Sequence, residues 1–375
     1  MARRGNDTTP LRRKLCLDGS FRGLVARRAA GAGRHLVNGL GAGDDSRAEF
    51  PFPNGYHPML IMRHHRRSHR QIARLALASF TTMVFALAAA LAPRTAGAQR
   101  PFKVYISVDM EGIAGVVTGD QLGPTGFEYE RARGFMTGEA LAAIAGARDA
   151  GATEIVVSDS HGNGESLLID QFPDDVRIVR SWPRPLMMME GIDSTFSAAI
   201  FVGYHASTTS PAGVRAHTIS SANLASVSLN GVAMPEAGIN AAIAGRFGVP
   251  VVFISGDNVA VDETRRLLGD VEGAVVKQAI SFHAASTMTP KAAQQLIRDH
   301  VKAALQRRTA FKPYVVKAPV TLDVIFKNYR PAEMLAFLSS VQRTTSHGIR
   351  FVGKDMIEVS KFLEFIGTYE PGLAP

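Results

Sequence analysis

The chain has 375 residues, a formal net charge of +9 and a single cysteine, Cys16. Residues 1–99 hold 16 of the 42 Lys and Arg and 5 of the 33 Asp and Glu, so residues 100–375 hold 26 basic and 28 acidic residues, a net charge of −2. This near-neutral part lacks the basic surface that binding to nucleic acid requires, and without cysteine it would bind a metal through nitrogen and oxygen ligands only.

The first part of the chain is interpreted as an extension followed by a targeting segment. Residues 1–61 are rich in Arg and Gly without hydrophobic periodicity and are predicted to be disordered. Residues 62–98 combine a basic start, an apolar run over 75–91 and Ala-Gly-Ala at 96–98, which is typical of a secretory signal peptide. We therefore expect translation to start at Met62, with 1–61 an over-long extension, and a periplasmic or secreted protein. The alternative, a permanent membrane anchor, is disfavoured because no later apolar span occurs.

From residue 99 onward, strand-like apolar runs alternate with helix-like segments. This alternation predicts an α/β layered fold, α/β/α with a mainly parallel sheet, and a smaller C-terminal α+β lobe. We assign 99–256 to a metal-binding catalytic region and 257–375 to a region that completes the same unit. In chain order, strands are predicted over 104–108, 154–157, 198–202, 224–229, 251–254, 274–276, 320–326 and 349–352, and helices over 128–150, 235–247, 262–268, 290–307, 331–341 and 356–366.

Carboxylates and imidazoles follow the first of these strands. Asp109 and Glu111 are two residues apart after the first strand, so in a continuing strand both point to one face while Met110 points into apolar packing. Gly112 then permits a tight turn. His161 follows the second strand, where Asp159 is either its hydrogen-bond partner or a ligand itself. The negative charges of Asp109 and Glu111 repel each other unless a cation lies between them, so these two carboxylates favour a metal site.

Three further candidates lie later in the chain. His205 follows the buried run at 198–202, His217 lies twelve residues on, and Glu236 begins a helix. In parallel sheets, binding sites lie outside the carboxyl ends of the strands. The six residues suit Zn²⁺, with Mn²⁺ or Co²⁺ as alternatives, and they suffice for two ions that would activate water for hydrolysis.

Other patterns are weaker. The remaining histidines of the mature chain are interpreted as structural or surface residues. A serine triad of Ser160, His217 and Asp257 is disfavoured because no Gly-x-Ser-x-Gly elbow occurs.

Taken together, the motifs resemble the M55 family of zinc-dependent D-aminopeptidases over roughly residues 103–370. The segments that carry the resemblance are Ser-Val-Asp-Met-Glu-Gly at 107–112, Asp-Ser-His at 159–161, Gly-Tyr-His-Ala at 203–206, Ala-His at 216–217 and Glu-Ala-Gly-Ile-Asn at 236–240.

The resemblance implies a two-zinc centre. Its ligands would be Asp109, Glu111, His161, His205 and Glu236, with Asp109 as the bridge. His217 matches the catalytic position, assigned as the nucleophile in the family; on physical grounds we prefer a base or a stabiliser of the tetrahedral intermediate.

The resemblance also implies removal of N-terminal D-residues from short peptides by a ring-like homodecamer. The competing interpretations are a dizinc hydrolase of another amide or ester and a periplasmic peptide-binding protein. Export departs from the family's cytoplasmic setting, so the exact substrate is left open.

Overall fold

The structure is a computed structural model and describes residues 101–369. The extension and the signal peptide expected from the sequence lie outside this range. Among the described residues, no helix is both long and apolar enough to cross a membrane.

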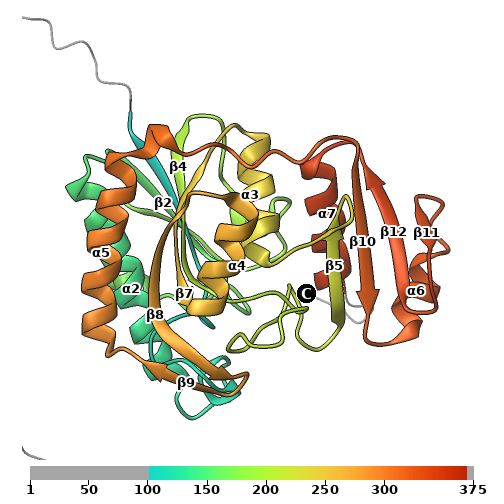
Figure 1. The fold of residues 1–375 in the computed structure, drawn as a ribbon, viewed down its shortest axis with the longest axis horizontal. Coiled ribbons are helices and arrows are strands. Elements are labelled where there is room, and N and C mark those ends of the chain that lie inside the picture. The colour runs from blue at the N-terminus through green and yellow to red at the C-terminus, as the bar shows by residue number, and fades with distance from the viewer. Residues whose placement is uncertain (1–100, 370–375) are drawn as a thin grey trace, which may run out of the picture. The chain divides into compact units, whose positions relative to one another are not determined.

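A seven-stranded sheet, sheet A, forms the centre of the described part (Figure 1). Its neighbouring strands are parallel, except that the last pairs antiparallel with its neighbour. In spatial order they are β3 (Arg177–Val179), β2 (Glu154–Asp159), β1 (Lys103–Val108), β4 (Phe196–Tyr204), β7 (Val251–Asp257), β8 (Glu272–Ser281) and β9 (Ala284–Thr287).

Helices cover both faces of sheet A, which explains why its central strands are nearly continuous apolar runs. One face packs on α2 (Tyr129–Asp149) and α5 (Pro290–Gln306), and the opposite face packs on α3 (Glu236–Arg246) and α4 (Asn258–Leu268) (Figure 1). Alternate residues of β4 therefore belong to different cores, with Ile200 on the α2 side and Phe201 on the α3 side, both fully buried.

A second, antiparallel sheet forms the smaller lobe. Sheet B has the order β11 (Val341–Arg343), β12 (Gly348–Gly353), β10 (Val320–Phe326), β5 (Leu224–Leu229) and β6 (Val232–Ala233). Alternate side chains of β10 are buried, and α7 (Met356–Thr368) packs against this lobe while α6 (Tyr329–Leu335) lies at its end (Figure 1). The layered α/β fold with a mainly parallel sheet and a smaller α+β lobe is thus confirmed.

Some boundaries differ from the sequence-based expectation. Helix α4 begins at Asn258 rather than 262 because the Asp257 carboxylate caps it, accepting the Ala260 N–H at 2.8 Å. The helix expected over 331–341 ends at Leu335, and 341–343 forms strand β11 instead. The short strands β3, β9 and β11 were not expected because three or four half-exposed residues carry too little periodicity.

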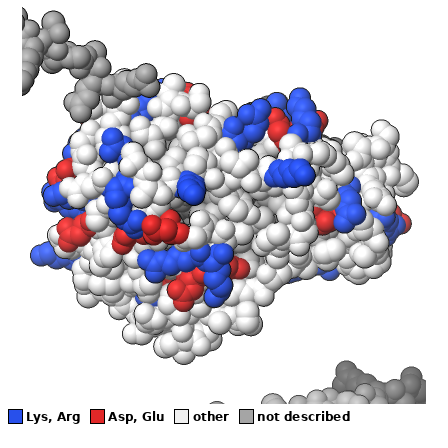
Figure 2. Space-filling view, turned by 45° about the horizontal axis from the view of Figure 1, so that its top comes forward, with Lys and Arg blue, Asp and Glu red and all other residues white. Residues whose placement is uncertain are grey.

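The charged surface is mixed. Figure 2 shows basic and acidic side chains interspersed over the visible face. Exposed ion pairs such as Arg307–Asp270 and Arg298–Asp149, both 2.8 Å, occur in the described part. On this face, the described residues form no basic stripe of the kind that follows a phosphate backbone.

The register of sheet A brings three segments to one edge. Val108, the last residue of β1, lies beside Asp159 of β2 and Val202 of β4. Residues 109–112, 160–162 and 205–206 therefore leave the sheet next to one another.

Candidate metal centre

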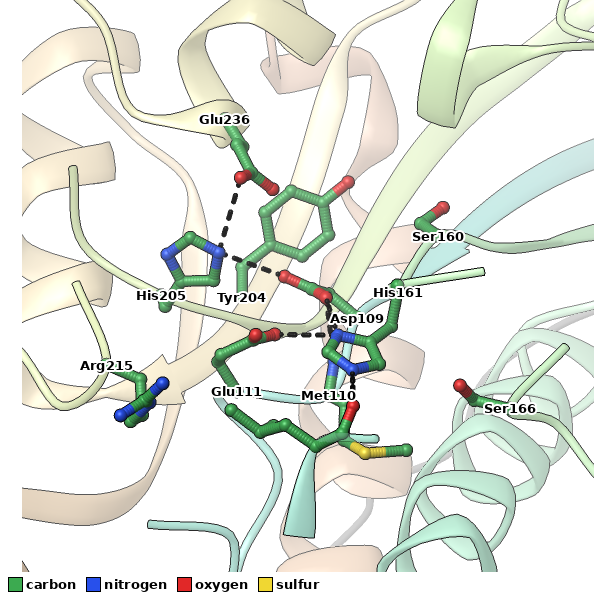
Figure 3. A network of polar contacts seen from close by, with 12 residues as sticks. Asp109, Met110, Glu111, Ser160, His161, Ser166, Tyr204, His205, Arg215 and Glu236 are labelled. Carbon is green, nitrogen blue, oxygen red and sulfur yellow. Dashed lines mark hydrogen bonds and ion pairs between the residues drawn. The ribbon is translucent and has the colours of Figure 1, made fainter. Parts of the chain in front are cut away.

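All six residues predicted from the sequence converge at this edge, and Figure 3 shows five of them in one network. Asp109 directly follows β1, and its N–H donates to the Val202 carbonyl at 2.8 Å, which holds it beside the end of β4. Met110 is fully buried, so Asp109 and Glu111 face the site while the side chain between them enters the core, as predicted. The packing of Met110 in the core thus explains why an apolar residue separates the two acidic residues.

Gly112 lies in the predicted turn, and a close approach of two backbones also requires glycine there. Its N–H donates to the Gly203 carbonyl at 2.7 Å. A Cβ atom at residue 112 would lie 2.1 Å from the Tyr204 carbonyl oxygen. The segment that carries Glu111 and the segment that carries His205 are therefore in direct contact.

One group of ligand atoms surrounds His161 Nδ1. This nitrogen lies 2.9 Å from Glu111 Oε2 and 3.3 Å from Asp109 Oδ1 (Figure 3). The other ring nitrogen, Nε2, lies 2.8 Å from the Leu122 carbonyl, to which it donates. This bond directs Nδ1 toward the carboxylates, as second partners of metal-binding histidines commonly do.

A second group surrounds His205 Nε2. This nitrogen lies 3.3 Å from Asp109 Oδ2 and 3.5 Å from Glu236 Oε1 (Figure 3). The other nitrogen, Nδ1, donates to the Ala206 carbonyl at 3.0 Å. Glu236, the first residue of α3, is itself positioned by the Ile219 N–H, which donates to Oε1 at 2.7 Å. The two oxygens of Asp109 thus face two different groups.

His217 lies at the edge of the cluster, and its ring offers a ligand atom within 4.8 Å of those of His205 and Glu236. Its ring stacks on that of His205 with centroids 4.0 Å apart and planes 8° apart, and its Nε2 lies 3.7 Å from Glu236 Oε1. The His217 side chain is 14% exposed, whereas that of His205 is 1% exposed. His205 is therefore enclosed, and His217 faces open space.

That open space is a cavity of about 320 Å³. Its lining includes His217 and the carboxylates of Asp109, Glu111 and Glu236. Residues of α7 and of the segment after β3 complete the lining, among them Trp182, Met187, Met188, Leu363, Glu364 and Thr368. A cavity of this size accommodates a small ligand.

Burial and charge set the pKa values of the cluster. Burial raises the pKa of Asp109, and the Glu111 charge raises it further. Burial also acts to raise the pKa of Glu111, but the facing His161 outweighs it and holds this pKa well below its usual range. For His161 and His205, burial lowers the pKa, yet the nearby carboxylates raise it well above the usual value. The carboxylates therefore favour positive charge at this position, and a bound divalent cation would supply it.

The donor atoms fit zinc. Asp109 Oδ2 and His205 Nε2 are buried and have no hydrogen-bond partner among the described residues, although buried polar atoms normally have one. Ligands about 2.1 Å from a tetrahedral zinc ion lie about 3.4 Å apart, close to the 3.3 and 3.5 Å that separate His205 Nε2 from its two carboxylates. One zinc ion bound here would provide a partner for both unpaired atoms, Asp109 Oδ2 and His205 Nε2.

The alternatives raised by the sequence are not seen. Ser160 Oγ bonds to Ser107 Oγ at 2.7 Å, and Asp257 accepts the Val214 N–H at 2.7 Å, so no serine triad forms. Asp159 accepts the Leu167 N–H at 2.7 Å and makes no hydrogen bond to His161 within the described range. The orienting role considered for Asp159 was therefore wrong, and the Leu122 carbonyl takes that role.

Lys277, a buried lysine on β8, belongs to a segment that resembles the family, Val-Lys-Gln at 276–278, but the sequence assigned it no role. Its Nζ donates to the carbonyls of Glu111, Ile113 and Val116, the last two at 3.0 and 2.5 Å. Lys277 thus holds the loop that carries two of the carboxylates. The sequence feature that could have indicated this role is a lysine directly after a buried apolar run.

Comparisons with known proteins identify the family of this chain. The profile of peptidase family M55, described as D-aminopeptidase, matches residues 102–365. A D-aminopeptidase of Bacillus subtilis (strain 168) is 35% identical over 257 residues, which are 68% of this chain and 93% of the relative. A solved structure, the Zn-dependent D-aminopeptidase DppA from Bacillus subtilis, a self-compartmentalizing protease, has a TM-score of 0.68 and 32% identity and covers 72% of this chain and 100% of that chain. The chain therefore belongs to the M55 family of D-aminopeptidases.

Proposed function

We propose that this peptidase is a two-zinc enzyme that removes N-terminal D-residues from short peptides. The observation that carries the proposal is the arrangement around Asp109, whose two oxygens face two separate nitrogen donors. One zinc ion would be held by Asp109, Glu111 and His161, and the other by Asp109, His205 and Glu236. Bound zinc would activate water as the nucleophile and polarise the scissile carbonyl group.

His217 is proposed as the catalytic residue. Its Nδ1 lies 2.8 Å from the Arg215 carbonyl, to which it donates, so Nε2 is the ring nitrogen left to exchange a proton with the substrate. His217 also lines the cavity, as a group that contacts the substrate must. It would act as a base, or in its protonated form as a donor to the developing oxyanion.

The preference for short D-peptides rests on two supports. The cavity is small, about 320 Å³, and both Bacillus relatives are D-aminopeptidases.

We also propose that the protein is a homo-oligomer, specifically a homodecamer. The solved relative is a self-compartmentalizing protease, and near α6 the side chains of Tyr329, Met334, Phe337 and Leu338 are exposed, with Phe337 at 78%. Exposed apolar clusters of this kind commonly mark protein interfaces.

An activity panel tests the proposed function. The purified protein is assayed with D-Ala and L-Ala p-nitroanilides, before chelation, after chelation and after zinc is restored. We expect cleavage of the D-substrate that chelation abolishes and zinc restores. Cleavage that survives complete metal removal would refute the metal mechanism, and cleavage of L-substrates alone would refute the D-specificity. Activity on other amides or esters alone would favour the alternative dizinc hydrolase.

Location and assembly need separate measurements. We propose export to the periplasm or the medium without stable membrane association, and the intact mass of the exported protein should place its N-terminus near Gln99. Peptides from residues 1–61 in the cell would contradict the start at Met62. Light scattering during size-exclusion chromatography should give the mass of a decamer rather than a monomer.

A further inference from the structure

One carboxylate in the cavity has no role in the proposed metal centre. Glu364 lies on α7 and is 7% exposed. Four acidic residues line the cavity among the described residues, and the other three, Asp109, Glu111 and Glu236, are proposed ligands. Glu364 lines the cavity together with Trp182 and Thr368.

Glu364 has little charge compensation. Its Oε1 accepts the Arg184 N–H at 2.9 Å, and no cationic side chain of the described residues forms an ion pair with it. The Arg184 guanidinium is engaged elsewhere, because it donates to Ser158 Oγ at 2.8 Å and to the Asp159 carbonyl at 2.6 Å.

The charges around Glu364 leave its ionised form incompletely stabilised. Burial raises the pKa of Glu364 and the nearby Glu190 adds to this effect, while the bond from Arg184 and its charge oppose it. A largely buried carboxylate is costly to hold ionised without a cationic partner. A cationic group of a bound ligand would therefore stabilise the ionised Glu364 carboxylate.

We propose that Glu364 binds the N-terminal α-ammonium group of the peptide substrate. The proposal rests on the proposed aminopeptidase function, since only such a substrate brings a free ammonium group into the cavity. An ammonium group carries three donors and one positive charge, which match the uncompensated carboxylate. The ligand cluster and His217 line the same cavity, so a peptide anchored at Glu364 would lie in the space that they also face.

This anchor explains how the cavity would select the first peptide bond. A fixed ammonium group sets the distance from the chain end to the bond that reaches His217. Peptides with a blocked amine would place an uncharged amide against Glu364 and leave its charge unpaired, which strongly disfavours binding. Glu364 would thus be a specificity residue, distinct from the groups that carry out hydrolysis.

The variant Glu364→Gln isolates the charge. The amide retains an oxygen that accepts the Arg184 N–H and has nearly the same shape, so a merely structural role would survive. Glu358→Gln is the matched control, because Glu358 lies on the same helix, accepts the Lys354 N–H at 2.5 Å and does not line the cavity. Glu364→Asp retains the charge on a shorter side chain.

We expect Glu364→Gln to raise KM for a D-Ala dipeptide about 10- to 100-fold, the usual effect of losing one charged hydrogen bond, with kcat and zinc content nearly unchanged. Competitive inhibition supplies the second measurement: the wild type should bind D-alanine amide more tightly than propionamide, which lacks the amine, and Glu364→Gln should lose this difference. Glu364→Asp should recover part of it, and Glu358→Gln should behave as wild type.

Two results would overturn the proposal: an unchanged KM with the inhibitor preference intact in Glu364→Gln, or a fall in kcat alone. Failure of the proposed function is distinguishable, because the wild type itself would then lack zinc-dependent cleavage.

Discussion

Replacing Gly112 by alanine should separate two segments of the metal centre. The added Cβ would lie 2.1 Å from the Tyr204 carbonyl oxygen and 2.4 Å from the Gly203 carbonyl carbon. Both neighbours are backbone atoms of the segment that leads to His205, so no side chain can rotate away. Ordinary contact begins at 3.4 Å, which means that the two segments must move apart by roughly 1.3 Å, the difference between 3.4 and 2.1 Å.

The displacement has two costs. Overpacking in a close-packed interior costs about 1–3 kcal/mol, and losing the bond from the Gly112 N–H to the Gly203 carbonyl adds about 1–3 kcal/mol. Metal sites tolerate ligand distances only within about 0.2 Å. A shift of this size between Glu111 and His205 should therefore reduce zinc affinity more than it reduces folding.

The assay compares zinc per subunit, after dialysis against a weak chelator, with the melting temperature. Gly134→Ala is the control, because a Cβ at this position of α2 meets nothing within 4 Å and alanine is the better helix former. We expect Gly112→Ala to lose zinc and activity and to melt at a lower temperature, and Gly134→Ala to retain both. A Gly112→Ala protein with full zinc content and activity would refute the claim that this backbone contact sets the site.

Three further outcomes follow from the structure. His205→Ala should lose zinc, whereas His217→Ala should keep it and lose turnover, as measured by metal analysis beside kcat; the opposite pattern would reverse the two roles. Lys277→Met removes the donor to the Glu111 carbonyl and should lower zinc affinity in a chelator competition, so unchanged affinity would refute its positioning role. Burial raises the pKa of Glu139 to about 7, although the hydrogen bond from the Ala114 N–H and the charge of Lys277 act to lower it. Between about pH 4.5 and 7, the folded state therefore retains a proton that the unfolded state has released. Stability should therefore fall by up to about 3 kcal/mol as pH rises through this window, and Glu139→Gln should remove that fall in urea titrations; equal pH slopes for both proteins would contradict it.

The sequence predicted the ligand-bearing edge because its physical cause is local. Buried strands end at Val108, Asp159 and Tyr204, and a polar residue follows each one. Parallel strands bring their carboxyl ends to one edge, so the residues could be placed together without knowing their geometry. The residue pattern alone could not predict that the two oxygens of Asp109 face different nitrogen donors, because this depends on the strand register; only the family resemblance implied a bridging Asp109.

The contribution of α7 to the cavity could not be predicted. Trp182 and Glu364 are 182 residues apart in the sequence and meet only because α7 packs beside the loop after β3. Both predicted ends of α6 were wrong. The helix begins earlier because Asn328 caps it, accepting the Arg330 N–H at 3.0 Å. It ends at Leu335 because the chain beyond it forms β11, an edge strand of sheet B.

The zinc stoichiometry of activity tests the two-ion centre most directly. Metal-free protein is titrated with zinc while bound metal and cleavage of a D-Ala substrate are followed together. We predict that activity reaches its maximum at two zinc ions per subunit, and that the Asp109→Asn variant, altered at the bridging residue, fails to reach it. Full activity at one zinc ion per subunit, or without zinc, would contradict the two-zinc centre.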